Sequence, residues 1–133
     1  MVGAILVSHE NLSVCMAETL AKITGETTFI TPISSRGISP GQLEQTVIHA
    51  IESMKEVDGI ILFTDLHGGS CSLVSSRIQR RYPEIVVITG VNLPLLIEYV
   101  FHRERPLGEI VDRIVRKGRE GIQWYTLGGE ESS

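Results

Sequence analysis

Short apolar runs recur along the chain and alternate with segments of helical periodicity. Four of these runs are rich in β-branched residues and poor in charge: 2–7, 27–31, 57–63 and 84–89. Runs of this kind are typical of strands that are buried on both faces, as in a parallel sheet covered by helices. The alternation therefore predicts an α/β fold in which successive strands are joined by helices.

The segments between the runs place apolar residues three or four positions apart, which predicts helices. The expected helices cover 11–23, a segment opened by Ser39-Pro40, about 69–78, a segment that begins near Asn92, and 107–118. A last short strand is expected over 122–127, antiparallel to its neighbour. The predicted order is βαβαβαβααβ, a parallel central sheet with helices on both faces and right-handed crossovers.

Size and composition favour a single domain. The chain has 133 residues, of which 42% are hydrophobic, and this suits one domain over 1–127 with a substantial core. The final residues, 128–133, read GGEESS, which predicts a flexible tail or the stub of a linker.

Charge and cysteine usage narrow the class of protein. The net charge is -4, and basic residues near the C-terminus are interleaved with acidic ones, so we expect no nucleic-acid partner. No apolar run is long enough to span a bilayer, and no basic segment precedes 2–7, so we expect neither membrane insertion nor a secretory signal. Only Cys15 and Cys71 are present, which is typical of reduced thiols in the cytoplasm.

Several polar residues fall where the predicted strands end. His9 follows the first strand, the segment 65–70 follows the third, and 90–92 follows the fourth. In open parallel sheets, ligands bind outside the carboxyl ends of the strands. We therefore expect these three loops to share one functional edge.

His9 is the sharpest candidate at that edge. Its imidazole could act as a nucleophile or base just before a helix N-terminus, where free N–H groups attract anions. Equally, a polar residue at this position could simply end the strand and cap the following helix. Position alone does not separate the two readings.

Asp65 and the turn after it favour a chemical role for His9 over a capping role. The carboxylate of Asp65 could accept a hydrogen bond from one ring nitrogen of His9 and leave the other as a nucleophile. Gly68 and Gly69 would let the backbone approach a ligand, and Ser70 would add a hydroxyl at a helix N-terminus. Together these residues predict a small cradle for a phosphoryl group, although a turn and a helix cap would use the same residue types.

Other chemistries have weaker support. His67 could join His9 on a metal ion, but the sequence has no HxH, HExxH or CxxC spacing, so we expect no metal site. Cys71 could be a thiolate nucleophile with His9 as its base, or a small buried residue of a helix. Neither GxxxxGK[ST] nor GxGxxG occurs, and we expect no cofactor.

Four stretches together resemble a known family, the enzyme IIA components of the mannose-family sugar phosphotransferase system. The resemblance runs from about Val2 to Tyr125. It is carried by GAILVSHENL around His9, by GIILFTDLHGGSCS and VVITGVNLPLLIEYV, and by GREGI. The combination is specific, whereas each stretch alone is not.

The resemblance implies a phosphocarrier. His9 matches the family's phosphorylated histidine, which takes a phosphoryl group from the small protein HPr and passes it to an enzyme IIB. Asp65 matches the carboxylate that orients this histidine, and Ser70 matches a hydroxyl that contacts the phosphoryl group. The family also implies a homodimer, with 122–127 packed against the partner subunit.

The sequence departs from the family pattern near the site. His67 stands where an aromatic is frequent, and Cys71 begins a Cys-Ser-Leu that replaces Pro-Phe-Asn. We expect His67, Cys71 and Asn92 to line the docking surface for partner proteins. Two alternatives stay open: a regulatory module whose phosphorylation state is read by a partner, and the phosphoryl-donor subunit of dihydroxyacetone kinase.

Overall fold

The computed structural model describes residues 1–128 and 131–132, and it contains the predicted alternation of strands and helices. In chain order the elements are β1 (Val2–Ser8), α1 (Leu12–Thr24), β2 (Ile30–Ser34), α2 (Pro40–Ser53), β3 (Gly59–Thr64), α3 (Gly69–Arg81), β4 (Val86–Ile88), α4 (Leu93–His102), α5 (Leu107–Glu120), β5 (Trp124–Tyr125) and β6 (Glu131–Ser132). The order through β5 confirms the predicted βαβαβαβααβ.

The central sheet has the strand order β2-β1-β3-β4, and all of its neighbouring strands are parallel. The chain passes from β1 to β2 on one side and then crosses to β3 on the other side of β1. The carboxyl ends of β1 and β3 therefore meet where the direction of winding reverses. This topological switch point is where open parallel sheets bind ligands.

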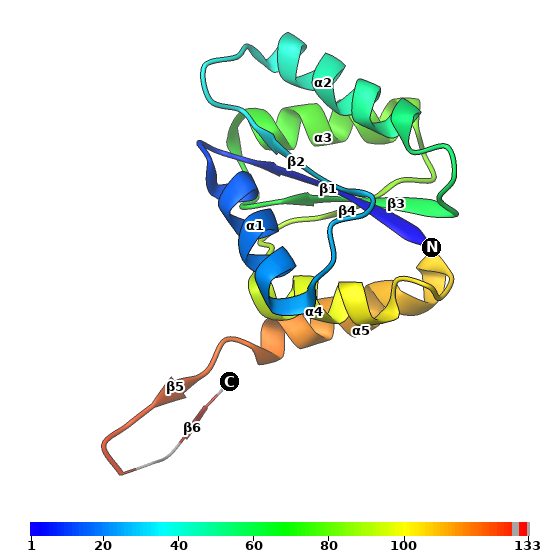
Figure 1. Cartoon of the computed structure of the whole chain (residues 1–133). Helices are drawn as coiled ribbons and strands as arrows, with labels where there is room; N and C mark the ends of the chain where they lie inside the picture. Colours follow the sequence, from blue (N-terminus) through cyan, green and yellow to red (C-terminus); the bar gives the residue numbers. More distant parts are fainter. Residues whose placement is uncertain (129–130, 133) are drawn as a thin grey trace.

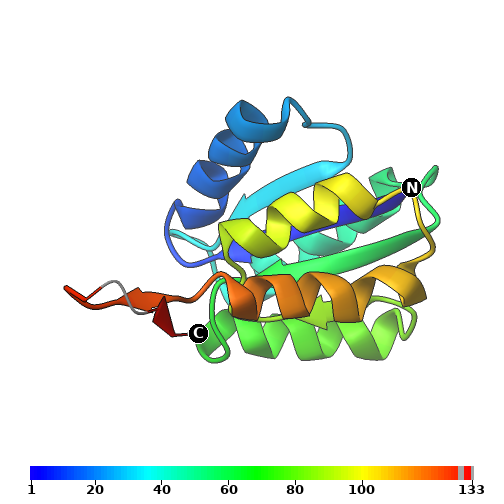
Figure 2. The ribbon, with the colours of Figure 1, turned by 90° about the horizontal axis from the view of Figure 1, so that it is seen from below.

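Helices cover both faces of the sheet. Figure 1 shows α2 and α3 on one face and α1, α4 and α5 on the other, and Figure 2 shows α4 and α5 side by side. The strands supply both cores, because alternate side chains point to opposite faces. In β1, for example, Ile5 packs with α2 and α3, whereas Leu6 packs with the three helices of the opposite face.

A buried tyrosine ties the second core to the start of the sheet. The ring of Tyr99 packs edge-on against Phe63 at 5.6 Å, and its hydroxyl donates a 2.7 Å hydrogen bond to the carbonyl of Val2. Burial raises the pKa of Tyr99 to about 12. The hydrogen bond satisfies a hydroxyl that would otherwise lose its water partners on burial.

The second strand was misplaced by the sequence pattern. It was predicted over 27–31 but runs from Ile30 to Ser34. A turn occupies the preceding residues: the N–H of Ile30 donates to the carbonyl of Thr27, and Phe29 has a φ of 55°. Pro32 weakened the strand signal, but it is tolerated here because β2 is an edge strand.

The C-terminal strand lies apart from the central sheet. β5 pairs antiparallel with β6, and Figure 1 shows this pair projecting from the body. Trp124 and Tyr125 are 55% and 66% exposed, so they do not belong to the core. Of the predicted tail 128–133, residues 131–132 form β6, and 129–130 and 133 lie outside the described residues.

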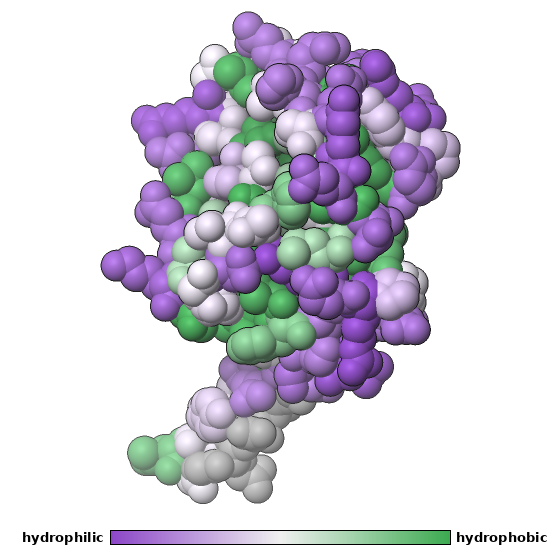
Figure 3. Space-filling model, turned by 45° about the vertical axis from the view of Figure 1, so that its right-hand side comes forward, coloured by the Kyte–Doolittle hydropathy of each residue, from purple (hydrophilic) through white to green (hydrophobic). Residues whose placement is uncertain are grey.

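Exposed apolar side chains gather near this projection. Ile122, Trp124, Tyr125 and Leu127 are all at least 55% exposed. Figure 3 shows apolar surface on the projecting segment and on the body just above it. Among the described residues, no helix has the length and apolar character needed to cross a membrane.

Candidate functional site

The turn between β1 and α1 presents His9 at the sheet edge. Ser8, the last residue of β1, accepts a 2.7 Å hydrogen bond from the N–H of Ser13 and so takes the place of a helix cap. Glu10 has a φ of 49°, and its carbonyl accepts a hydrogen bond from the Ser34 hydroxyl. The side chain of His9 is therefore not needed to cap α1.

The imidazole of His9 is held by Asp65 instead. Its Nδ1 lies 3.0 and 3.2 Å from the two carboxylate oxygens, and the backbone N–H of His9 donates to the same carboxylate at 2.9 Å. The side chain of Asp65 is 6% exposed, whereas that of His9 is 42% exposed. The carboxylate is thus buried behind a ring that solvent and partners can reach.

This contact fixes the roles of the two ring nitrogens. An ionised carboxylate only accepts hydrogen bonds, so Nδ1 must carry a proton to donate to Asp65. In the neutral ring, Nε2 then keeps its lone pair. The backbone N–H of Leu66 also donates to Asp65, at 2.9 Å, and helps to hold the carboxylate in place.

Two glycines bring the start of α3 close to the free nitrogen. Gly69 has a φ of 68°, and a Cβ at this position would lie 3.1 Å from Nε2 of His9. Gly68 has a φ of 148°, and its N–H donates a 2.7 Å hydrogen bond to the Ser72 hydroxyl. The first N–H groups of a helix have no acceptor within it and attract anions, and the first turn of α3, which includes Ser70, begins beside Nε2.

Cys71 lies beneath the ring and not on the surface. It is 0% exposed, and its Sγ is 4.0 Å from Nδ1 of His9. The prediction that its side chain lines a docking surface is therefore wrong. Burial raises the pKa of the thiol, and the Asp65 carboxylate raises it further. A thiolate nucleophile is disfavoured, because a protonated thiol is a poor one.

The other two predicted docking residues differ from each other. His67 is exposed and lines a shallow hollow with residues of α3 and β4. Asn92 caps α4: its Oδ1 accepts from the N–H of Leu95 at 3.1 Å, and its Nδ2 donates to the carbonyl of Gly118 at 2.9 Å. The amide of Asn92 therefore joins α4 to α5, which leaves His67 as the accessible member of the set.

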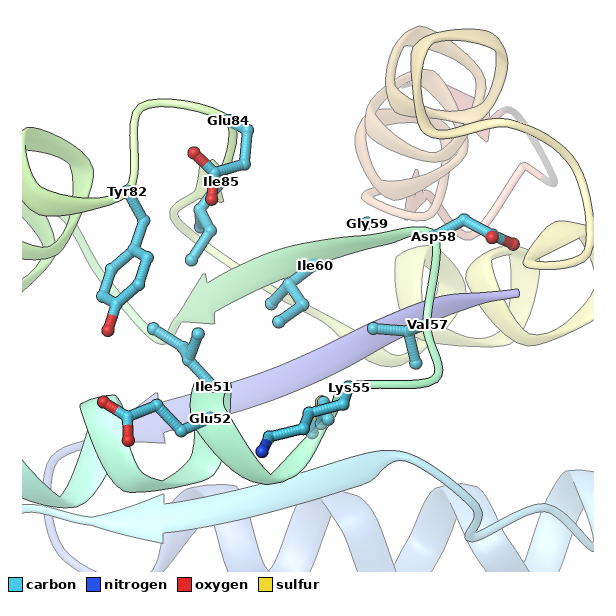
Figure 4. Close-up of a pocket in the computed structure, with 11 residues that line it drawn as sticks. Ile51, Glu52, Lys55, Val57, Asp58, Gly59, Ile60, Tyr82, Glu84 and Ile85 are labelled. Atoms are coloured by element: carbon cyan, nitrogen blue, oxygen red, sulfur yellow. The ribbon is translucent and has the colours of Figure 1, made fainter.

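A cavity of about 370 Å³ lies at the opposite edge of the sheet, between the end of α2 and the start of β3. Figure 4 shows the apolar side chains of Ile51, Ile60 and Ile85 turned toward it, with charged groups at its rim. No histidine or cysteine lines it. The cavity is therefore separate from the His9 edge and offers no comparable nucleophile.

One cluster of potential metal ligands could not be predicted from the sequence. Donor atoms of His9, Asp65 and Cys71 lie within 4.8 Å of one another, a cluster that could hold a metal ion. No short sequence motif contains the three residues, because they come from the end of β1, the end of β3 and the first turn of α3. Only the fold brings them together.

Several known proteins are similar to this chain in sequence and in fold. The family model described as PTS system fructose IIA component matches residues 3–115. YadI of Escherichia coli (strain K12), named provisionally as a phosphotransferase enzyme IIA component, is 27% identical over 129 residues, which cover 94% of this chain and 88% of that protein. The mannose-specific EIIAB component of the same strain is 31% identical over 90 residues, which cover 63% of this chain and 28% of that longer protein.

A solved structure is also similar to this chain and comes from the same kind of protein. The phosphotransferase system component EIIA from Streptococcus agalactiae has a TM-score of 0.83 and 28% identity, covering 92% of this chain and 95% of that one. The family match spans the central sheet and the loops that carry His9 and Asp65. The chain belongs to the mannose-family enzyme IIA components of the phosphotransferase system.

Proposed function

We propose that this chain is a phosphocarrier that accepts a phosphoryl group from HPr on Nε2 of His9 and passes it to an enzyme IIB. The observation that carries the proposal is the contact of Asp65 with both Nδ1 and the backbone N–H of His9. It holds the ring in the tautomer whose Nε2 is a nucleophile. The side chain of His9 is 42% exposed, so a donor protein can reach the ring.

In the proposed transfer, the Nε2 lone pair attacks phosphorus in line with the bond to HPr. The new N–P bond forms as the bond to HPr breaks, and the electron pair of that bond returns to HPr. Positive charge that develops on the imidazole is stabilised by Asp65, which stays ionised and hydrogen bonded to Nδ1. Phosphoryl transfer needs mainly positioning and electrostatic stabilisation, and this arrangement supplies both.

The first turn of α3 would receive the phosphoryl oxygens. Gly69 lets the backbone approach within contact distance of Nε2, and no larger residue would leave room for a phosphoryl group there. The N–H groups of this turn and the hydroxyl of Ser70 are donors where the helix dipole favours negative charge. In the onward transfer to enzyme IIB, the same N–H groups and hydroxyl would stabilise the phosphoryl oxygens while the N–P bond breaks.

We also propose that two copies of the chain form a homodimer through the segment that contains β5. The exposed apolar side chains of 122–127 support this, since such patches mark interaction surfaces. Of the predicted docking residues, His67 is the one that we assign to the surface met by HPr or enzyme IIB. The proposed relay operates in the cytoplasm and needs no cofactor.

A reconstituted relay tests the proposal. The chain is incubated with phosphoenolpyruvate, enzyme I and HPr, and intact-mass spectrometry counts the phosphoryl groups. We expect one group, labile to acid and stable to base, that is lost in His9→Ala and retained in the matched control His49→Ala, whose histidine is exposed on α2. A label that persists in His9→Ala would refute the assignment. Phosphorylation without transfer to any enzyme IIB would favour the regulatory alternative.

A further inference from the structure

The thiol beneath His9 has no part in the phosphoryl transfer described above. Its Sγ lies 4.0 Å from Nδ1, on the same nitrogen that Asp65 approaches at 3.0 Å. A sulfur, an imidazole nitrogen and a carboxylate oxygen therefore converge from three different segments, all within 4.8 Å of one another. These are the three donor types that zinc prefers in proteins.

The spacing of the donors is close to that of a tetrahedral site. Zinc bonds of about 2.0–2.3 Å place neighbouring donor atoms about 3.4–3.6 Å apart. The Nδ1 to carboxylate distance of 3.0 Å would have to lengthen, and the Nδ1 to Sγ distance of 4.0 Å would have to shorten, each by about half an ångström. The third pair, Sγ of Cys71 and the Asp65 carboxylate, lies within 4.8 Å.

Access and charge also suit a divalent cation. His9 is 42% exposed, so a water molecule could complete the coordination from the open side. Such a site has three protein ligands and one exchangeable position. The free thiol is protonated, and a bound cation would displace its proton to solvent, since a coordinating thiol is deprotonated. The cation would also offset the negative charge of the Asp65 carboxylate.

We propose that His9, Asp65 and Cys71 form a Zn²⁺ site that competes with phosphorylation of His9. A metal on Nδ1 moves the ring proton to Nε2, which then has no lone pair for attack on phosphorus. Overall the protein takes up one Zn²⁺ and releases one proton, from the thiol. The metal site stands independently of the proposed function, whereas the competition rests on it.

Cobalt(II) tests the site without any phosphorylation. Purified metal-free chain is titrated with Co²⁺, and we expect a thiolate-to-cobalt charge-transfer band that one equivalent of Zn²⁺ removes. The band should be lost in Cys71→Ser and retained in the matched control Cys15→Ser, because Cys15 is an exposed cysteine of α1. Cys71→Ala serves as a second variant if the serine destabilises the fold. A wild-type protein without the band, or a band that survives in folded Cys71 variants, would overturn the site.

The competition is measured in a second experiment. Purified phospho-HPr donates to the chain in a single turnover at increasing Zn²⁺, and each variant is compared with its own metal-free rate. We expect half-inhibition of Cys71→Ser to require at least about tenfold more Zn²⁺ than that of wild type or Cys15→Ser. Equal inhibition of all three would overturn the competition. The two proposals can also fail separately. If no variant accepts a phosphoryl group even without metal, but the wild type shows the cobalt band, the proposed function is refuted and the metal site is retained.

Discussion

At His9, one carboxylate decides which ring nitrogen can react. Asp65 contacts Nδ1 with both oxygens and also accepts the backbone N–H of the same residue. Rotation of the ring would break the contact of Nδ1 with both carboxylate oxygens, while the backbone bond fixes the carboxylate next to the ring. The structure of this single residue pair supports the proposed nucleophile more strongly than the sequence position of His9 does.

Replacement of Asp65 tests this orientation. In Asp65→Asn the amide could donate to Nδ1 and favour the tautomer that protonates Nε2, so we expect the rate of phosphorylation by phospho-HPr to fall about 10²-fold or more. The matched control is Asp58→Asn, whose carboxylate is 79% exposed at the opposite edge of the sheet. Rapid-quench kinetics on both variants give the comparison. An unchanged rate in folded Asp65→Asn would mean that the ring is oriented by something else.

Gly69 gives a second prediction for the site. A methyl group there would lie 3.1 Å from Nε2, where the phosphoryl group must bind, so Gly69→Ala should abolish phosphorylation. Its φ of 68° adds about 1–2 kcal/mol of strain. Gly25→Ala is the matched control: φ is 76° and the new methyl meets no atom within 4 Å, so it should lose stability but keep the phosphorylation rate. Equal rates in the two variants would contradict the close approach.

At the scale of elements, α4 and α5 depend on a glycine contact. A Cβ on Gly118 would lie 3.0 Å from the Cβ of Leu95, so the two helices pack nearly backbone to backbone. The carbonyl of the same glycine accepts the Asn92 amide. The helix predicted over 107–118 continues to Glu120, so Gly118 lies buried inside α5 and Gly121 is the residue at the C-cap.

Alanine substitutions in α5 test that packing. Overpacking at Gly118 should outweigh the helix propensity gained, so Gly118→Ala should lower the free energy of unfolding by about 1–2 kcal/mol. Gly108→Ala in the same helix meets no atom within 4 Å and should be neutral or stabilising by up to about 1 kcal/mol. Urea unfolding measures both. If the two variants were stabilised alike, the close contact would not exist in solution.

The central strands β1 and β3 could be predicted from the sequence, because they are buried on both faces and leave continuous apolar runs. The pairing of His9 with Asp65 could also be anticipated, since both residues follow the two central strands. β2 was misplaced because an edge strand is only partly buried and its pattern is interrupted by Pro32. Cys71 was wrongly assigned to the docking surface because the sequence does not show how the positive φ values of Gly68 and Gly69 turn the start of α3, whereas its other interpretation, a small buried residue of a helix, is confirmed.

At the scale of the whole molecule, the projecting C-terminal segment predicts self-association. We expect the chain to sediment as a dimer of twice 14.7 kDa at micromolar concentration, and Trp124→Asp to shift it toward monomer. Ile23→Asp is the matched control, because Ile23 is also 55% exposed but lies at the end of α1. Analytical ultracentrifugation distinguishes the outcomes. A monomeric wild-type protein, or equal dissociation by both substitutions, would contradict the proposed interface.

The central claim is that Nε2 of His9 carries the phosphoryl group while Asp65 holds Nδ1. Long-range ¹H–¹⁵N correlation and ³¹P spectra of ¹⁵N-histidine-labelled protein, recorded before and after phosphorylation by phospho-HPr, report both nitrogens directly. The account predicts a proton on Nδ1 before the reaction, and afterwards a phosphorus coupled to Nε2 with the proton still on Nδ1. A phosphorus coupled to Nδ1, or to a histidine other than His9, would contradict it.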